Sequence, residues 1–240
     1  MSIVVEVTQA RERLRAAASL CVLTGAGISA ESGLPTFRGA GGLWRTYRFE
    51  ELASPQGFAR DPQLVWTWYN ERRAAHASVE PNAGHAALAL AEARHADFTL
   101  VTQNVDSLHV RAGSRNVLEL HGNLREARCT GCSARRTLAA GMPLDEIEHP
   151  CGGRFRPDIV WFGESLPTDV WKRALEAASR ADVMLVVGTS GIVNPAASLA
   201  THYARRAFIV EVNPEVTAIT PYAGLSLRAT ATHALPALLG

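Results

Sequence analysis

Three features that would mark a secreted, membrane-bound or strongly charged protein are missing from this sequence of 240 residues. No apolar run approaches the length of a membrane span, and Met1–Ala10 lacks a basic start followed by a long apolar segment. We therefore expect neither a membrane partner nor a secretory signal. The formal net charge is only +1, so bulk charge predicts no preference for nucleic acid or for acidic partners.

Cysteine is also scarce, with four residues in the chain. Without a secretory signal, so few cysteines indicate a reducing compartment, and we expect a cytoplasmic protein whose cysteines bind metal or pack in the core. Internal repeats and low-complexity segments are absent as well. What the chain does have is a hydrophobic content of 47%, which suffices for one α/β domain or for a large domain with a small insert.

Four short apolar runs, rich in Val and Leu, have the character of buried parallel strands. They are Leu20–Leu23, Phe98–Val101, Val183–Val187 and Phe208–Val212. Segments with helical spacing or helix-start signals separate these runs, at Thr8–Ala18, Pro62–Ala77, Asn82–Arg94, Thr168–Ser179 and Ala196–Arg205. This alternation of strands and helices predicts an α/β fold with a doubly wound, Rossmann-like parallel sheet.

Residues 122–160 interrupt the alternation with three cysteines, several arginines and few long apolar runs. We expect them to form a small inserted module that resembles a zinc ribbon. The large domain is then discontinuous and comprises residues 1–121 and 161–240, and a helical segment at 35–80 would close a cleft beside it.

A glycine-rich turn, Thr24–Gly33, follows the first apolar run. Its Gly-x-Gly-x-x-Ala spacing, between a strand and a helix start, is typical of a backbone that approaches a pyrophosphate. Gly25 would allow the tight turn, Gly27 would remove a side chain that blocks the phosphates, and Ala30 would keep the next helix close to the sheet. A glycine-rich turn that binds no ligand remains the alternative.

Polar residues follow each of the four runs, at Thr24-Gly25, Thr102-Gln103-Asn104, Gly188-Thr189-Ser190 and Asn213. Ligands of open α/β sheets bind at the carboxyl ends of the strands, so we expect these positions to converge on one crevice. Ordinary turns also favour Gly, Ser and Asn, which is the competing explanation.

Cys129 and Cys132 form a C-x-x-C pair, and Cys151 lies at a spacing that suits a second pair. Tetrahedral zinc needs four thiolate or imidazole ligands, but the position that would complete the second pair is Glu148. The neighbouring His149 could supply a nitrogen, although Pro150 restricts its backbone. Two interpretations therefore remain: a zinc site whose fourth ligand is His149 or Glu148, and a ribbon held by packing without metal.

Together these segments resemble the sirtuin family, the NAD-dependent protein lysine deacylases. The resemblance rests on segments that occur in the family's order and cover residues 20 to about 235: Gly25–Gly33, Pro35–Gly39, Thr102–His109, His121-Gly122, the C-x-x-C pair, Arg156–Glu164, Gly188–Ser190 and Val212-Asn213. The chain departs from the family at Glu148, where the family's zinc pattern has a cysteine.

Within the family the sequence looks like the class III branch, whose members remove acidic acyl groups. Thr36 stands where most sirtuins carry Asp, and Tyr69 and Arg72 match the branch's Tyr-x-x-Arg. Residues three apart share a helix face, where a guanidinium and a phenol can bind one carboxylate. The alternative is a solvated helix face, because Glu71 and Arg73 make this stretch generally charged.

The resemblance implies that NAD binds in the crevice, with its pyrophosphate over Gly25–Gly27. The positions carried over to NAD are Gly25, Ala26, Gly27, Ser29, Ala30, Glu31, Thr36, Phe37, Arg38, Trp44, Gln103, Asn104, Asp106, Gly188, Thr189, Ser190, Asn213, Glu215 and Ala231. Among them, Phe37 and Arg38 would cover the nicotinamide side, the 103–106 positions would hold the ribose and the nicotinamide amide, and the later ones would line the adenosine half.

The resemblance also implies that the acyl-lysine oxygen attacks the ribose carbon as nicotinamide leaves, so no enzyme nucleophile is needed. His121 is the expected general base, because it ends an apolar segment and precedes Gly122, and an imidazole titrates near working pH. His76, His85, His95 and His202 are better explained as surface or packing residues. The loop from Pro35 to Trp44 would have to exclude water.

The substrate, an acyl-lysine protein or peptide, is expected to add as a strand beside Val160–Gly163, with Val160, Phe162 and Gly163 as contacts. A plain core strand at Ile159–Phe162 fits the pattern equally well.

Three other functions use similar residues. Protein mono-ADP-ribosyl transfer could take place in the same crevice, and a sensor could bind NAD or ADP-ribose without turnover. A sensor needs no base, so His121, Asn104 and Asp106 together count against it. A dehydrogenase should carry an acidic residue about 20 residues after the glycines, where this chain has Trp44, Arg45 and Tyr47.

Overall fold

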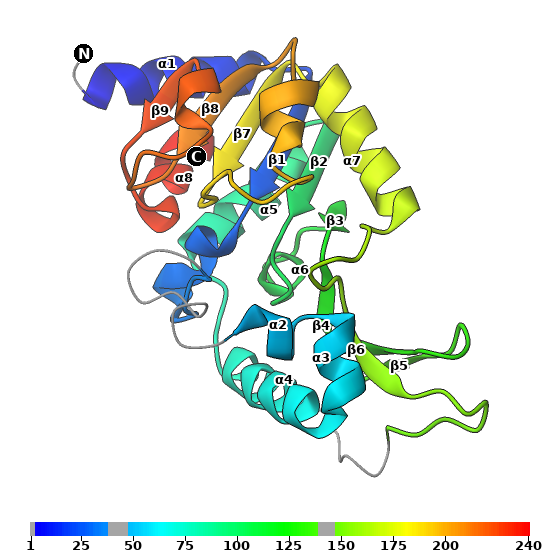
Figure 1. The fold of residues 1–240 in the computed structure, drawn as a ribbon. Helices are drawn as coiled ribbons and strands as arrows, with labels where there is room; N and C mark the ends of the chain where they lie inside the picture. Colours follow the sequence, from blue (N-terminus) through cyan, green and yellow to red (C-terminus); the bar gives the residue numbers. More distant parts are fainter. Residues whose placement is uncertain (1–2, 38–47, 139–146) are drawn as a thin grey trace.

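A computed structural model of the chain describes residues 3–37, 48–138 and 147–240, with side chains from residue 6 onward. Figure 1 shows two lobes, a large one that contains both termini and a smaller one beneath it. No helix among these described residues combines the length and the apolar character that crossing a bilayer requires.

The large lobe is built on a six-stranded parallel sheet. In spatial order its strands are β3 (Val117–Glu119), β2 (Asp97–Thr102), β1 (Ser19–Thr24), β7 (Val183–Val187), β8 (Phe208–Val212) and β9 (Leu225–Leu227). The order of the strands reverses between β1 and β7, which places the ligand-binding edge of such a sheet at their carboxyl ends. The predicted doubly wound parallel sheet is confirmed.

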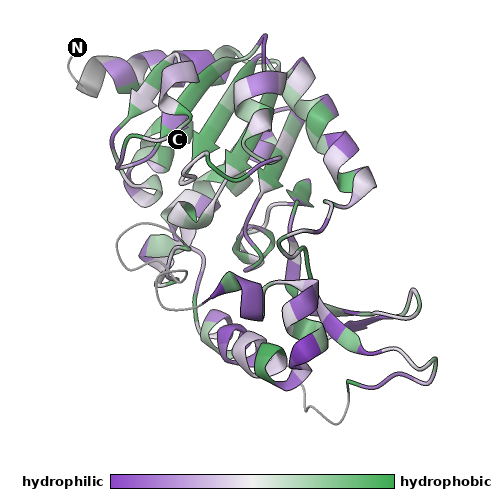
Figure 2. Cartoon of the chain, viewed as in Figure 1, coloured by the Kyte–Doolittle hydropathy of each residue, from purple (hydrophilic) through white to green (hydrophobic). Residues whose placement is uncertain are grey.

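Helices cover both faces of this sheet. One face carries α1 (Ile3–Ala16), α5 (Ala83–Arg94) and α8 (Ala231–Leu239), and the other carries α7 (Thr168–Arg180) and the π-helix η4 (Leu199–Tyr203). Alternate residues of one strand enter different cores: Leu20 and Val22 face the first, whereas Cys21 and Leu23 face the second. Because both faces are buried, the strands are apolar throughout, as the green strands at the centre of Figure 2 show.

The smaller lobe joins helices to a second sheet. It contains α2 (Phe49–Leu52), α3 (Pro55–Arg60), α4 (Pro62–Ala77) and the antiparallel strands β5 (Arg135–Thr137), β4 (Gly122–Cys129) and β6 (Phe155–Ile159). Phe58 and Trp66 from the helices pack in one core with Leu124 and Phe155 from the strands. The Trp66 indole also donates a hydrogen bond to the Phe155 carbonyl oxygen at 3.0 Å. The predicted insert therefore folds together with the helices that were expected to close the cleft.

Several helix ends follow directly from capping residues. Helix α4 begins at Pro62 as predicted, because Asp61 accepts a hydrogen bond from Leu64 N at 2.9 Å and proline is favoured at the first helical position. Helix α5 begins one residue later than predicted, since Asn82 is its N-cap and accepts from Gly84 N at 2.9 Å.

Other predicted elements differ from the structure. The glycine-rich turn leads into a 3₁₀-helix, η1 (Ala26–Ser32), and the Ala196–Arg205 helix is reduced to turns and η4. The first helix lies earlier than Thr8–Ala18, and β6 ends at Ile159, so Ile159–Phe162 is not a core strand. Strands β3 and β9 were not predicted as strands, because three residues are too few to show a pattern. The short elements α6 (Leu108–Arg111) and η5 (Thr220–Tyr222) lie in connections.

Gly122 sits where the chain passes from the large sheet to the small one, and its backbone leaves no room for a side chain. Its φ is +79°, and an added Cβ would lie 1.9 Å from the carbonyl oxygen of Asp158. Gly113 has a φ of +103°, but there an added Cβ would meet only the Ala89 side chain, at 4.0 Å.

We therefore expect Gly122→Ala to lower the free energy of unfolding by more than about 3 kcal/mol, because both backbone strain and a clash arise. The matched control Gly113→Ala should cost only the strain of about 1–2 kcal/mol. Urea unfolding measures both. Equal losses would show that the contact with Asp158 does not constrain position 122.

Candidate active site

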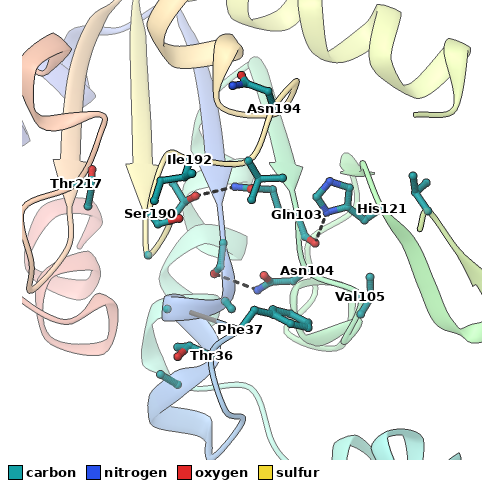
Figure 3. A pocket seen from close by; sticks show the side chains of 18 of the residues that line it. Thr36, Phe37, Gln103, Asn104, Val105, His121, Ser190, Ile192, Asn194 and Thr217 are labelled. Atoms are coloured by element: carbon teal, nitrogen blue, oxygen red, sulfur yellow. Dashed lines mark hydrogen bonds between the residues drawn. The ribbon is translucent and has the colours of Figure 1, made fainter. Parts of the chain in front are cut away.

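A cavity of about 730 Å³ opens at the carboxyl ends of the large sheet, and residues of both lobes line it. Its walls include Gly25 after β1, Gln103 and Asn104 after β2, Gly188–Ser190 after β7 and Asn213 after β8. Figure 3 shows Gln103, Asn104 and His121 gathered on one side of it and Ser190 and Thr217 on the other. The expected convergence of four strand ends is thus confirmed.

One hydrogen bond per strand pair holds these strand ends in place. In each case the first residue after a strand donates its amide to the last residue of the neighbouring strand, at 2.9–3.1 Å: Leu120 to Thr102, Gln103 to Thr24, Gly25 to Val187, Gly188 to Val212 and Asn213 to Leu227. The parallel ladder therefore continues one step beyond the sheet, so the residues that begin the cavity wall share the rigidity of the core.

The structure shows that the two glycines of the predicted phosphate turn are also needed for a close contact with the turn after β7. An added Cβ on Gly27 would lie 2.7 Å from Gly188 Cα and 2.8 Å from its carbonyl oxygen, and one on Gly25 would lie 2.8 Å from the same oxygen. Gly27 N also donates to Gly188 O at 2.8 Å. The turn after β1 thus lies directly against the turn after β7, and this contact alone excludes side chains at both glycines.

Most of the predicted site residues line the cavity. Those on its wall are Gly25, Ala26, Gly27, Ala30, Glu31, Thr36, Phe37, Tyr69, Arg72, Gln103, Asn104, His121, Val160, Phe162, Gly163, Gly188, Thr189, Ser190, Asn213 and Glu215. Ser29 and Asp106 line a small adjoining cavity of about 20 Å³, together with Asn104 and Phe37. Ala231 is buried in the large core, and its neighbour Thr230 reaches the wall instead. Arg38 and Trp44 lie outside the described residues, as does much of the loop from Pro35 to Trp44.

A hydrogen-bond network fixes the polar floor between the two cavities. The Asn104 amide donates to Gly25 O and to Ser29 Oγ, both at 3.2 Å, and Ser29 Oγ donates to Asp106 Oδ2 at 2.8 Å. Asp106 Oδ1 accepts from Leu108 N at 2.9 Å. Burial raises the pKa of Asp106, so this carboxylate is held by its hydrogen bonds in a poorly solvated place.

His121 lies between β3 and β4, at the passage from one lobe to the other. Its Nδ1 is 2.9 Å from the carbonyl oxygen of Gln103, as Figure 3 shows. A carbonyl can only accept, so Nδ1 carries the proton and Nε2 is the acceptor nitrogen. Burial lowers the pKa of His121, although the bond to Gln103 opposes this. The ring is therefore neutral near pH 7 and suited to take up a proton.

Tyr69 and Arg72 of α4 also face the cavity, so the solvated-face interpretation is wrong for these two side chains. The Tyr69 hydroxyl accepts from the Trp161 indole at 2.9 Å, which leaves its own hydrogen to donate, and burial raises its pKa to about 12. The Arg72 guanidinium lies 4.9 Å from the Phe37 ring centre and 4.7 Å from that of Trp68. Stacking between two rings holds this cation at the cavity wall.

The segment Val160–Gly163 leaves β6 and forms part of the cavity wall. Val160 N donates to His121 O at 2.9 Å and Phe162 N donates to Ala53 O at 3.0 Å. Glu164 anchors the segment, because its carboxylate accepts from Trp161 N at 2.8 Å and from both terminal nitrogens of Arg156 at 2.6 and 2.9 Å. A peptide that added beside this segment would have to use backbone groups other than the amides of Val160, Trp161 and Phe162.

Apolar wall residues were missed by the sequence analysis. Ile192, Val193, Pro195 and Val216 line the cavity, and Ile192 and Val216 are 61% and 77% exposed. The search for strand-end signals looked for Gly, amide and hydroxyl groups, whereas ligand pockets are largely apolar. No pattern in a single sequence separates such residues from core residues.

The cysteine module brings four donor atoms together. The ligand atoms of Cys129, Cys132, His149 and Cys151 all lie within 4.8 Å of one another. Cys129 and Cys151 sulfurs are 3.5 Å apart, and Cys132 Sγ is 3.7 Å from His149 Nδ1. These separations match the edges of a zinc tetrahedron, about 3.8 Å between sulfurs at a Zn–S length of about 2.3 Å. Glu148 instead pairs with Arg154 at 2.8 Å, so the donor set fits zinc with His149 as its fourth member.

Comparison with known proteins gives a consistent result. Residues 25–195 match the Sir2 family. An NAD-dependent protein deacylase of Mycolicibacterium paratuberculosis is 54% identical over 92% of this chain and 96% of its own length. An NAD-dependent protein deacylase of Thermus thermophilus is 50% identical over 96% of this chain and 93% of its own length.

Solved structures of similar proteins carry ligands. A Sir2 homologue in complex with ADP-ribose superposes with a TM-score of 0.93 at 46% identity, covering 96% of this chain and 94% of that one. A Sir2–p53 peptide–NAD+ complex superposes with a TM-score of 0.80 at 31% identity, covering 94% and 93%. With a family match over residues 25–195 and about 50% identity to curated members over nearly the whole chain, this protein belongs to the Sir2 family.

Proposed function

We propose that this chain is an NAD-dependent protein lysine deacylase that releases nicotinamide and 2′-O-acyl-ADP-ribose. The observation that carries the proposal is the neutral, Nε2-accepting His121 on the wall of a cavity built from four strand ends. Relatives that share about half of their residues with it are named NAD-dependent protein deacylases. Near-neutral charge fits peptide substrates and gives no reason to expect nucleic acid or membrane partners.

Different residues of the cavity bind NAD and transfer the proton. NAD supplies the ribose carbon that accepts the acyl oxygen and the nicotinamide that leaves. The turn at Gly25–Gly27 binds the pyrophosphate, and the wall formed by Gly188–Ser190, Asn213 and Glu215 binds the adenosine half. Asn104 and Asp106 orient the nicotinamide end. With NAD and an acyl-lysine bound, His121 Nε2 would take the proton of a ribose hydroxyl while Nδ1 stays bonded to Gln103. The hydroxyl oxygen would then attack the former acyl carbonyl carbon, and water would complete the release of the lysine amine.

The test is an assay with an acyl-lysine peptide and NAD that counts products. Nicotinamide, deacylated peptide and 2′-O-acyl-ADP-ribose should form in equal amounts. Nicotinamide with ADP-ribosylated protein and no acyl release would instead identify a mono-ADP-ribosyltransferase. Saturable NAD binding without nicotinamide formation would identify a sensor.

Replacing the base should separate the two halves of the reaction. We expect His121→Ala to retain nicotinamide exchange and to lower product formation at least about 100-fold, since general bases contribute about that much. His202→Ala, an exposed histidine outside the cavity, is the control. In the wild type, kcat/KM should fall only below pH 6.5, because burial lowers the pKa of His121 and the base is lost when it protonates. Full turnover by His121→Ala would exclude this role.

We further propose that the acyl pocket reads a terminal carboxylate, as in succinyl-, malonyl- or glutaryl-lysine, which is the specificity of the class III branch. The support is a phenol whose oxygen already accepts from Trp161 and whose own hydrogen remains to donate, and a guanidinium held by two aromatic rings beside it. Together they offer charge-assisted hydrogen bonds to an anionic acyl end. Acetyl-lysine would still fit, without these bonds.

Arg72→Met should raise KM for a succinyl-lysine peptide by about 10- to 100-fold, the loss expected for hydrogen bonds to a charged group, and change KM for acetyl-lysine little. The exposed neighbour Glu71→Gln is the matched control on the same helix and should alter neither KM. If Arg72→Met weakens both peptides equally, the side chain shapes the lobe and does not read the acyl group.

Zinc is proposed as a structural ion of the small lobe, held by Cys129, Cys132, Cys151 and His149. The purified protein should contain about one zinc per chain, because a structural site normally fills. His149→Ala should lower the zinc content and the melting temperature, while Glu148→Gln should change neither, since Glu148 lies outside the donor group. Less than about 0.2 zinc per chain in the wild type would favour a metal-free ribbon.

A further inference from the structure

Glu211, near the end of β8, is a carboxylate buried in the large lobe. The residue is 1% exposed, and no other acidic residue of the described chain is as buried. It does not line the cavity, and it stands in a run of apolar residues, Phe208–Val212. A buried charge is costly unless it is paired and hydrogen-bonded, so its partners indicate what holds it there.

Four side chains donate to this carboxylate. Oε1 accepts from Thr217 Oγ1, while Oε2 accepts from Thr220 Oγ1 at 2.8 Å, Ser226 Oγ at 2.8 Å and Arg228 Nη2 at 3.1 Å. These hydrogen bonds and the Arg228 charge lower the pKa of Glu211 despite the opposing effect of burial. The carboxylate is therefore ionised and fully satisfied.

Two of these four donors, Thr217 and Thr220, belong to the segment that connects β8 to β9. The six consecutive residues 213–218 of this loop line the cavity. Arg228 also donates to the backbone of the loop, to Glu215 O at 2.7 Å and to Asn213 O at 3.3 Å. Thr220 Oγ1 in turn accepts from Thr217 N at 2.9 Å. The path of the 213–218 wall is thus set from behind by Glu211 and the groups it collects.

The Asn213 side chain also forms hydrogen bonds within this wall. Its Nδ2 donates to Thr189 O at 3.1 Å, and its Oδ1 accepts from Glu215 N at 3.1 Å. Asn213 therefore ties the loop to the turn after β7, and Ala218 N adds a bond to Ser190 O at 3.2 Å. Both ends of the loop are thus fixed, and the Thr217 side chain anchors it to Glu211 just before its second end.

We propose that Glu211 is a positioning residue for dinucleotide binding: it holds the 213–218 wall in the shape that receives the adenosine half of NAD. The inference rests on the proposed function, because it assumes that NAD occupies this cavity. A wall held in its bound shape spares the binding step the cost of ordering a six-residue loop. Glu211 touches no ligand in this account and acts through Thr217, Thr220 and Arg228.

A purely structural role of Glu211 predicts different effects on NAD binding, peptide binding and turnover. The loop lies on the β8–β9 side of the cavity, whereas His121 and Val160–Gly163 belong to the β3 side and the small lobe. Loosening the loop should therefore weaken NAD and leave the peptide site and the chemical step intact. General loosening of the sheet would instead affect NAD, peptide and turnover together.

The experiment compares Glu211→Gln with wild type in the full chain. NAD affinity is measured by calorimetry, and steady-state kinetics give KM for an acyl-lysine peptide and kcat at saturating NAD. Glutamine keeps the size of the side chain but loses the charge and one acceptor oxygen. We expect Kd for NAD to rise about tenfold, which corresponds to about 1.4 kcal/mol, with kcat and the peptide KM within about twofold.

Two further variants test the inference even if Glu211→Gln fails to fold. Thr217→Val removes one loop donor at an accessible position and should raise Kd for NAD by about three- to fivefold. Ser226→Ala is the matched control, because it removes a 2.8 Å bond to the same carboxylate from strand β9 and not from the loop. Its Kd for NAD should stay within about twofold of wild type.

The outcomes separate this inference from the proposed function. Wild type that binds NAD, with unchanged affinity in both Glu211→Gln and Thr217→Val, overturns the inference and leaves the proposed function standing. Parallel losses in NAD affinity, peptide KM and kcat also overturn it, since they mark a structural role. A wild type that binds no NAD would overturn both.

Discussion

The continuation of the parallel ladder beyond the sheet is the interaction on which the rest of the site depends. Five backbone hydrogen bonds run in the same direction across the strand ends, from Leu120 at β3 to Asn213 at β8. Each fixes the backbone of the first residue of a connecting segment through a ladder hydrogen bond. The cavity wall therefore begins on rigid backbone, and the close contact between Gly27 and Gly188 keeps the two central turns from separating. Ligand-binding loops are usually the mobile part of a fold, and here their first residues are not.

The same ladder places the base. Leu120 is bonded to Thr102 in the large sheet, and His121 O accepts from Val160 N in the small lobe. His121 thus stands at the joint of the two lobes, with its Nδ1 directed to Gln103 O on the neighbouring strand end. The position of His121 thus fixes the tautomer of its imidazole through Gln103 O and attaches the small lobe through Val160 N. Relative movement of the lobes would act directly on this residue.

Sequence reasoning succeeded where one physical requirement determined the residues. Buried parallel strands must be apolar on both faces, so β1, β2, β7 and β8 were found within a residue or two, and the polar groups after them marked the cavity. It failed where the cause lies in a distant segment. The turn after β7 explains Gly27, Asp158 explains Gly122, and β9 is too short to show a pattern. Glu211 was hidden because it stands in an apolar run, and only tertiary structure reveals its four donors.

Beyond the ladder, carboxylates that accept several hydrogen bonds hold the remaining wall segments. The 213–218 wall rests on Glu211, the Val160–Gly163 segment rests on Glu164 paired with Arg156, and the η1 turn rests on Ser29 bonded to Asp106. A buried carboxylate that loses its donors is strongly destabilising, so each loop has few conformations in which its carboxylate stays satisfied. The charge need not add net stability to restrict the loop, because it destabilises the loop conformations in which the carboxylate loses its donors. A cavity whose walls are held in this way is preorganised for a ligand, because fewer wall conformations remain to be excluded on binding.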